Sequence, residues 1–473
     1  MDYKKDLLNE NDQKLLIIAH LRDENIIEEH DDNEEKSKYF SSLSEQLLVN
    51  YAHNDYSAIN NSIECIKQFA SDKNTKNMLN VFIKYDLASV LVNCLNYNEN
   101  IDTFELLTCI SYCLAHEDEI SILFMQNNFL NLASRFLQNQ DYIVPIINSL
   151  SNIAACSSTN ISLILEIIPL QIFINISKTF SDHQKIMEKV SHLFMNIAQK
   201  PPVSEELLIT LLELSNCAQF PSVILNSLWG IHYCFYRASS WTITDSNSND
   251  FTNPEIFLHN LINFILTAPN NIKYISCLLI SDLAKILPSE LFQFINFDFL
   301  FPVLNLEDQT IVKAALLCFK ELITRRINWV SVKLLEQCQY LISSSPFKVK
   351  REISETVASM VLNCTPLECI ELMKQGILDI FSEMLEMDLP SVKNVVKCLT
   401  RLIYALNTKG TDLNEEDKIE QHQILFSFFQ NYNIMEQINE LVQNYNDENL
   451  GFEFKILDTA YKTNFLDLLS NEE

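Results

Sequence analysis

The chain has 473 residues, of which 48% are hydrophobic and only 4 are glycine, and its formal net charge at pH 7 is −28. This length exceeds one ordinary hydrophobic core, which indicates either several domains or an architecture that grows by repetition. The scarcity of glycine argues against β-sandwiches and Rossmann folds, which need it at tight turns and phosphate loops. The acidic charge argues against nucleic acid and anionic membranes as partners, and favours basic protein segments.

The N-terminal segment, residues 1–45, is expected to be a disordered acidic arm. Residues 1–40 contain 12 acidic and 6 basic residues, including the acidic run at 28–35. Such a segment repels itself and buries little apolar surface, so it is typical of a solvated tail. We expect a repeat region over residues 46–466 and a short tail over 467–473.

A short motif recurs along this repeat region. It consists of the apolar end of a helix, a residue suited to the left-handed conformation, and a new amphipathic helix. The residues suited to end one helix or cap the next are Asp86, Asn128, Asp298, Gly376 and Asn433. Asp86 and Asn128 are 42 residues apart, and Asp298 and Gly376 are 78 apart, close to twice that distance. A period near 40 residues predicts HEAT or armadillo repeats.

A second marker follows the same period in the last helix of each repeat. Superposing these helices places one set of residues at an equivalent position: Tyr112, Asn152, Asn196, Tyr233, Asp282, Glu321 and Ser359. The residue four positions earlier lies on the same helix face, which in a solenoid lines the concave groove. Leu228 is expected to point into the core instead. The sequence therefore predicts an all-α fold, a right-handed superhelical solenoid of about ten armadillo repeats.

Four stretches carry a resemblance to a known family: NSLSNIAACSS (148–158), NIAQKPP (196–202), LWGIHY (228–233) and ENLGFEFKILDTAYK (448–462). Together they resemble importin-α, the nuclear import adaptor, from about residue 57 to about residue 466. The resemblance implies groove helices with Trp and Asn at i and i+4. The Asn amide holds the backbone of an extended peptide, and the Trp rings form slots for Lys or Arg.

The resemblance assigns a peptide-binding groove residue by residue. Asn152 and Asn196 match the Asn of the third and fourth repeats, and Trp229 with Tyr233 matches the aromatic pair of the fifth. Glu355 stands at a Trp position and Glu321 at an Asn position, where each is expected to pair directly with a basic peptide. The remaining Trp positions hold other residues: Thr108, Asn148, His192 and Leu317.

Two functional hypotheses follow from this pattern. The first is an importin-α-like adaptor that recognises basic segments of cargo, similar to nuclear localisation signals, for nuclear protein import. Its partners are basic cargo and, as a further candidate, an importin-β-like transport factor, and its location is the cytoplasm and nucleus. The alternative is a degenerate armadillo scaffold for protein–protein interaction without import activity. The lost Trp array and the acidic arm, which replaces the family's basic importin-β-binding segment, favour the alternative.

Neither an enzyme nor a cofactor is expected. The four glycines form no GxGxxG, P-loop or GxSxG motif. The Cys109/Cys113 and Cys364/Cys369 pairs lack a second pair at zinc spacing, so no metal site is expected. The 13 cysteines lie in apolar helical stretches and indicate reduced thiols. Apolar runs are shorter than the roughly 18 residues that span a bilayer, so no membrane anchor is expected.

Overall fold

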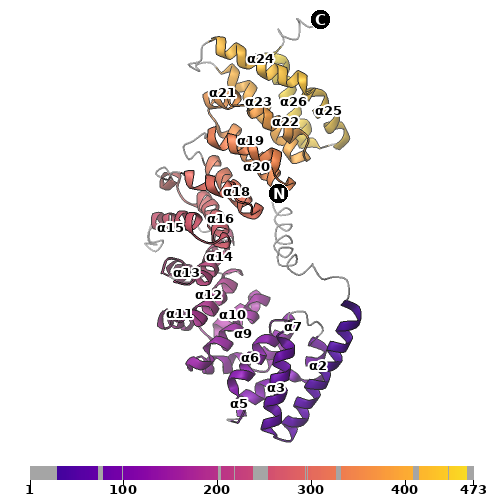
Figure 1. The fold of residues 1–473 in the computed structure, drawn as a ribbon, viewed down its shortest axis with the longest axis vertical. Coiled ribbons are helices and arrows are strands. Elements are labelled where there is room, and N and C mark those ends of the chain that lie inside the picture. The colour runs from indigo at the N-terminus through magenta and orange to yellow at the C-terminus, as the bar shows by residue number, and fades with distance from the viewer. Residues whose placement is uncertain are drawn as a thin grey trace. The chain divides into compact units, whose positions relative to one another are not determined.

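A computed structural model describes residues 29–72, 78–97, 100–200, 204–217, 219–237, 254–292, 295, 297–325, 332–408, 415–445 and 447–465. Over these residues the chain forms 25 α-helices and three short 3-10 helices, without a strand. The predicted all-α repeat architecture is confirmed. The chain divides into two compact units, residues 1–207 and 208–473, with the boundary inside α13 (Figure 1).

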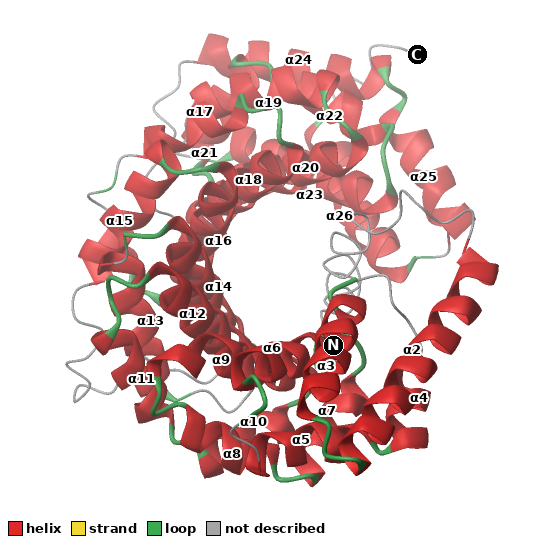
Figure 2. Ribbon diagram, turned by 60° about the horizontal axis from the view of Figure 1, so that its bottom comes forward, coloured by secondary structure: helices red, strands yellow, loops and turns green. Residues whose placement is uncertain are grey.

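The first unit begins with two helices and continues with three repeats of three helices. Its elements are α2 (Glu29–Ala52), α3 (Tyr56–Ala70), α4 (Met78–Tyr85), α5 (Leu87–Tyr97), α6 (Thr103–Cys113), α7 (Asp118–Gln126), α8 (Phe129–Phe136), η2 (Gln140–Tyr142), α9 (Ile143–Cys156), α10 (Ser158–Ile167), α11 (Leu170–Thr179) and α12 (Gln184–Ala198). Helices α3, α6, α9 and α12 pack each against the next and form the inner layer of this unit, as Figure 2 shows.

The second unit combines two-helix repeats with three-helix repeats at its C-terminal end. Its elements are α13 (Glu205–Cys217), α14 (Pro221–Arg237), α15 (Pro254–Thr267), α16 (Asn270–Ile286), η3 (Ser289–Phe292), η4 (Phe297–Leu300), α17 (Phe301–Leu304), α18 (Gln309–Thr324), α19 (Val332–Ser344), α20 (Phe347–Asn363), α21 (Pro366–Lys374), α22 (Ile377–Leu385), α23 (Leu389–Asn407), α24 (Glu415–Asn431), α25 (Ile434–Tyr445) and α26 (Glu448–Asn464). Helices α14, α16, α18, α20, α23 and α26 pack in this order as its inner layer (Figure 2).

The predicted turn residues mostly adopt the left-handed conformation. Asp86, Asn128, Asn433 and Gly376 have φ of 47°, 67°, 48° and 84°. Glycine, and Asn or Asp through local hydrogen bonds, tolerate this region, which reverses the chain between two helices. The prediction is wrong at Asp298, which lies in η4 and lacks a positive φ, because a 3-10 turn makes the connection there.

Within the first unit, buried aromatic rings connect one repeat to the next. In the first unit the Phe40 and Phe82 ring centroids are 6.1 Å apart, and those of Phe82 and Phe124 are 5.8 Å apart. All three side chains are 1% exposed or less. Each aromatic ring buried in this way stabilises the fold by about 1.5–3 kcal/mol. No repeat can bury these rings alone, so neighbouring repeats depend on one another.

The predicted start of the solenoid at residue 46 is too late. Helix α2 begins at Glu29, and Phe40 stacks on Phe69 of α3 with 4.8 Å between ring centroids. Leu43 is also buried, so this part of the expected arm belongs to the first repeat. Residues 1–28 and the predicted tail 467–473 lie outside the described residues.

No single described helix combines the length and the apolar composition that a membrane crossing needs. Two bent pairs, α4 with α5 and α10 with α11, reach both only when taken together.

Candidate functional site

All six predicted groove residues lie on inner-layer helices. Asn152 is on α9, Asn196 on α12, Trp229 and Tyr233 on α14, Glu321 on α18, and Glu355 on α20. The first two belong to the first unit and the other four to the second. They therefore form separate candidate surfaces, each with its own chemistry.

The two asparagines bind the neighbouring repeat. Asn152 Nδ2 donates to the backbone oxygen of Ser111 on α6 at 2.9 Å. Asn196 Nδ2 donates to the backbone oxygen of Ser151 on α9 at 3.0 Å and to its Oγ at 2.9 Å. Asn196 is only 6% exposed. The resemblance assigns these amide donors to the backbone of a bound peptide. In the structure they instead bond to a serine on the inner helix of the preceding repeat.

Further polar contacts link the same three inner helices, α6, α9 and α12. Asn148 Nδ2 donates to Ser111 Oγ, and Lys189 Nζ on α12 donates to Asn148 Oδ1 at 2.7 Å. His192 Nδ1 lies 2.7 Å from Ser151 Oγ. Burial lowers the pKa of Lys189, and burial together with the charge of Lys189 lowers the pKa of His192. The imidazole is therefore neutral at pH 7.

The C-terminal end of α9 meets a lysine. Lys200 Nζ donates to the backbone oxygens of Ala155 and Cys156, both at 2.9 Å. A cation at this position satisfies carbonyls that have no intrahelical partner and complements the helix dipole. Burial raises the pKa of the Cys156 thiol to about 11. The thiol therefore stays neutral and supplies no charge for a basic peptide.

Trp229 and Tyr233, the aromatic pair expected from the resemblance, lie side by side on α14 in the second unit. The Trp229 and Tyr233 rings stack with centroids 5.8 Å apart and planes 29° apart, and Tyr274 of α16 lies 6.0 Å from Trp229. All three side chains are half-buried, whereas Leu228 is fully buried as predicted. Trp229 lies beside both other rings, so the three form one aromatic cluster, Trp229, Tyr233 and Tyr274, in place of separated slots.

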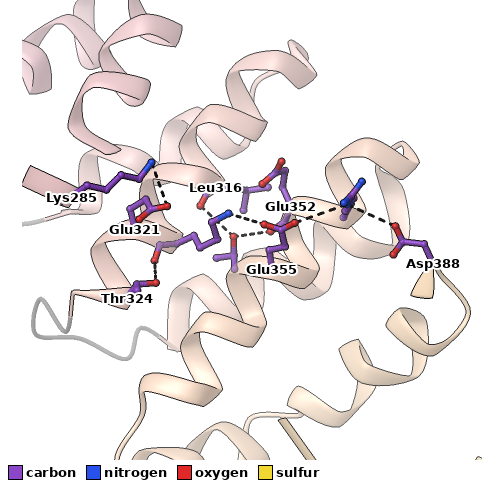
Figure 3. A network of polar contacts seen from close by, with 10 residues as sticks. Lys285, Leu316, Glu321, Thr324, Glu352, Glu355 and Asp388 are labelled. Atoms are coloured by element: carbon purple, nitrogen blue, oxygen red, sulfur yellow. Dashed lines mark hydrogen bonds and ion pairs between the residues drawn. The ribbon is translucent and has the colours of Figure 1, made fainter. Parts of the chain in front are cut away.

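The two predicted acidic groove residues already have basic partners (Figure 3). Lys285 Nζ lies 3.6 Å from a carboxylate oxygen of Glu321, and Lys320 Nζ lies 2.7 Å from one of Glu355. Burial alone would lower the pKa of Lys320, but the charge of Glu355 and its hydrogen bond raise it overall. A basic peptide would have to compete with these lysines for the two carboxylates.

The same kind of pair joins the later repeats of the second unit. Arg351 Nε lies 3.8 Å from an Asp388 oxygen, and Lys393 Nζ lies 2.6 Å from one of Asp447. In each pair the base belongs to the earlier repeat and the acid to the next. Sequence carried a signal for this arrangement, since Lys285 precedes Glu321 by 36 residues, close to one repeat.

The acidic charge of the chain is not concentrated on these inner helices. Helices α16, α18, α20 and α23 together carry ten basic and four acidic residues, although the whole chain has a net charge of −28. These four inner-layer helices are therefore richer in lysine and arginine than in acid. Over the described residues, no group of three or more His, Cys, Asp or Glu is arranged to hold a metal ion.

Comparison with solved structures bears on the fold. An engineered protein from a structural genomics consortium matches with a TM-score of 0.70 and 13% identity, over 89% of this chain and 98% of that one. A structure from work on the phosphorylation switch that controls the interaction between cadherin and beta-catenin matches with a TM-score of 0.52 and 10% identity, over 89% and 100%. The fold is of the armadillo type.

The same comparisons do not show a family. A designed armadillo repeat protein overlaps with a TM-score of 0.35 and 15% identity, over 60% of this chain and 99% of that one. No protein-family model matches the chain, and no curated protein matches it. Structural neighbours are armadillo-repeat proteins, and membership of the importin-α family is not shown.

Proposed function

We propose that the chain is an armadillo-type scaffold that binds an extended segment of a partner protein along an inner layer and catalyses no reaction. The observation that carries the proposal is the half-buried aromatic cluster of Trp229, Tyr233 and Tyr274 on two adjoining inner helices. Tyr and Trp are enriched at protein interfaces because they bury a large rigid surface at low cost in conformational entropy. One structural neighbour comes from work on the interaction between cadherin and beta-catenin, which shows the fold in a protein-binding context.

A selection followed by a matched pair of variants tests this proposal. Random 12-residue peptides displayed on phage are enriched on the immobilised chain, and the affinity of the best peptide is then measured by calorimetry. Trp229→Leu is expected to weaken binding about tenfold or more, as for an aromatic residue at the centre of an interface. The control is Tyr340→Leu, which changes a 66% exposed ring on the outer helix α19. No enriched peptide, or an equal loss in both variants, would contradict the proposal.

A second candidate is the importin-α-like adaptor, which binds basic segments of cargo and works between cytoplasm and nucleus with an importin-β-like factor. The stacked Trp229–Tyr233 pair, at the position of the family's fifth-repeat aromatic pair, favours it. The engaged asparagine amides and the paired carboxylates of Glu321 and Glu355 count against it.

A lysine-rich peptide and an importin-β pull-down separate the two candidates. The adaptor predicts binding that weakens steeply with salt and is lost in Trp229→Leu, because cation–π and ionic contacts would carry it. It also predicts direct capture of importin-β. Absence of both at about 0.15 M ionic strength, together with binding of a selected peptide, would leave the scaffold and remove the adaptor.

A further inference from the structure

Lys189 differs from Lys67 and Lys320, two half-buried lysines of the inner layers, in the partner that it meets. Lys67 Nζ on α3 pairs with the carboxylate of Glu105, and Lys320 Nζ pairs with that of Glu355. Lys189 Nζ instead donates to the amide oxygen of Asn148 at 2.7 Å, and its side chain is half-buried. An amide oxygen supplies a dipole and no charge, so this ammonium is partly desolvated without a countercharge at its contact.

The helix packed against Lys189 supplies no negative charge. Helix α9, which faces it, contains no charged residue. Glu188 precedes Lys189 on α12, and its carboxylate accepts a hydrogen bond from Gln184 Nε2 at 2.8 Å. Burial lowers the pKa of Lys189, and the charge of Glu188 offsets this only in part. Lys200 adds a second ammonium at the end of α9, where burial and the nearby Asp118 carboxylate raise the pKa of the Cys156 thiol. The helix that faces Lys189 therefore offers it uncharged groups, among them the Asn148 amide.

We propose that Lys189 and Asn148 bind a carboxylate of an extended acidic segment of a partner protein, laid across α9 and α12 in the first unit. The ammonium has three donors, of which one is given to Asn148, and a carboxylate accepts N–H donors in a charge-assisted bond. The bound carboxylate supplies the countercharge that Glu105 and Glu355 supply elsewhere. The inference rests on the proposed function only in that an inner layer binds a protein segment.

The overall charge of −28 opposes the approach of an acidic segment over long distances. At about 0.15 M ionic strength the screening length is roughly 8 Å, so contacts at the site decide affinity under those conditions. The segment is also chemically distinct from the basic cargo of the adaptor candidate. A single pair of peptides of opposite charge therefore separates the two.

The test uses three synthetic peptides of equal length and spacing, with Glu, Gln or Lys at the same positions, and the full chain at about 0.15 M ionic strength. Fluorescence anisotropy is expected to show binding of the Glu peptide, with the Gln peptide weaker by about ten- to a hundredfold, as for the loss of a charged hydrogen bond. Lys189→Met should cause a similar loss. The control is Lys185→Met, which replaces an exposed lysine of the same helix and should leave the affinity for the Glu peptide unchanged.

A variant that supplies the carboxylate within the chain provides an independent check. Asn148→Asp should pair with Lys189, abolish binding of the Glu peptide and leave the helical circular dichroism spectrum intact. Equal binding of the Glu and Gln peptides, equal loss in Lys185→Met and Lys189→Met, or unchanged binding in Asn148→Asp would each overturn the inference. Binding of the Glu peptide only after removal of residues 1–28 would also overturn it, in favour of the chain's own acidic segment as occupant. The Trp229 variant tests the second unit, whereas Lys189 lies in the first. A negative result for peptide binding at Trp229 can therefore be told apart from a negative result at Lys189.

Discussion

The role of Asn196 separates a residue that holds repeats together from one that holds a ligand. Asn196→Ala removes two hydrogen bonds to Ser151, at 3.0 and 2.9 Å, from a side chain that is 6% exposed. Each such bond contributes about 0.5–1.5 kcal/mol. The free energy of unfolding should therefore fall by about 1–3 kcal/mol.

Asn152→Ala is the matched control on the previous repeat. Asn152 is half-buried and makes one such bond, to Ser111, so its replacement should cost about 0.5–1.5 kcal/mol. For a unit of this size, 1 kcal/mol corresponds to roughly 2–4 °C in Tm, so Asn196→Ala should lower the Tm of the unit that contains it by about 2–12 °C.

Calorimetry of both variants measures the Tm, and titration with the best peptide from the selection on the chain measures affinity. The structure predicts a larger loss of stability for Asn196→Ala than for Asn152→Ala. It also predicts that peptides contacting the second unit keep their affinity in both. If Asn196→Ala melts as the wild type does but loses peptide binding, the amide faces a ligand and the assignment to repeat packing is wrong.

Three further results are expected. Leu228→Ala should lower the free energy of unfolding, measured in urea, by about 2–5 kcal/mol because the side chain is fully buried. Trp229→Ala should lower it less, by about 1–3 kcal/mol, because the ring is half-buried and packs on neighbouring rings. A larger loss for Trp229→Ala than for Leu228→Ala would make Trp229 a core residue. A double-mutant cycle of Lys320→Ala and Glu355→Ala should give a coupling of about 0.5–1 kcal/mol, and zero coupling would show that the pair does not join repeats. Folding lowers the pKa of His192 below its ordinary value of 6.5, so the unfolded chain binds a proton at this imidazole before the folded chain does as the pH falls. The free energy of unfolding should therefore decrease below about pH 6.5 more in the wild type than in His192→Gln. Parallel pH profiles of the two proteins would contradict the burial of His192.

The local and periodic parts of the fold were readable from sequence. A left-handed turn depends on one residue and its neighbours, so Asp86, Asn128 and Gly376 could be identified directly. The inner-layer register was also readable, since Asn152 and Asn196 recur at the repeat period. The hydrophobic pattern placed Leu228 in the core for the same reason.

The use of the inner-layer side chains was not readable in the same way. Whether Asn196 meets a peptide or Ser151 depends on a residue 45 positions away and on the distance between two helices. The family resemblance favoured the peptide. A search for polar or opposite charges one repeat apart, such as Lys285 with Glu321, would have indicated that these side chains satisfy one another.

Hydrogen exchange, measured by mass spectrometry with and without the best peptide from the display selection, tests most directly the claim that an inner layer binds extended protein segments. The account predicts slowed exchange in the inner-layer helices of one unit, centred on α14 and α16 for a peptide that depends on Trp229. The outer helices, such as α19, should exchange at the same rate with and without peptide. Protection confined to outer helices, with α14 and α16 unchanged, would contradict the account.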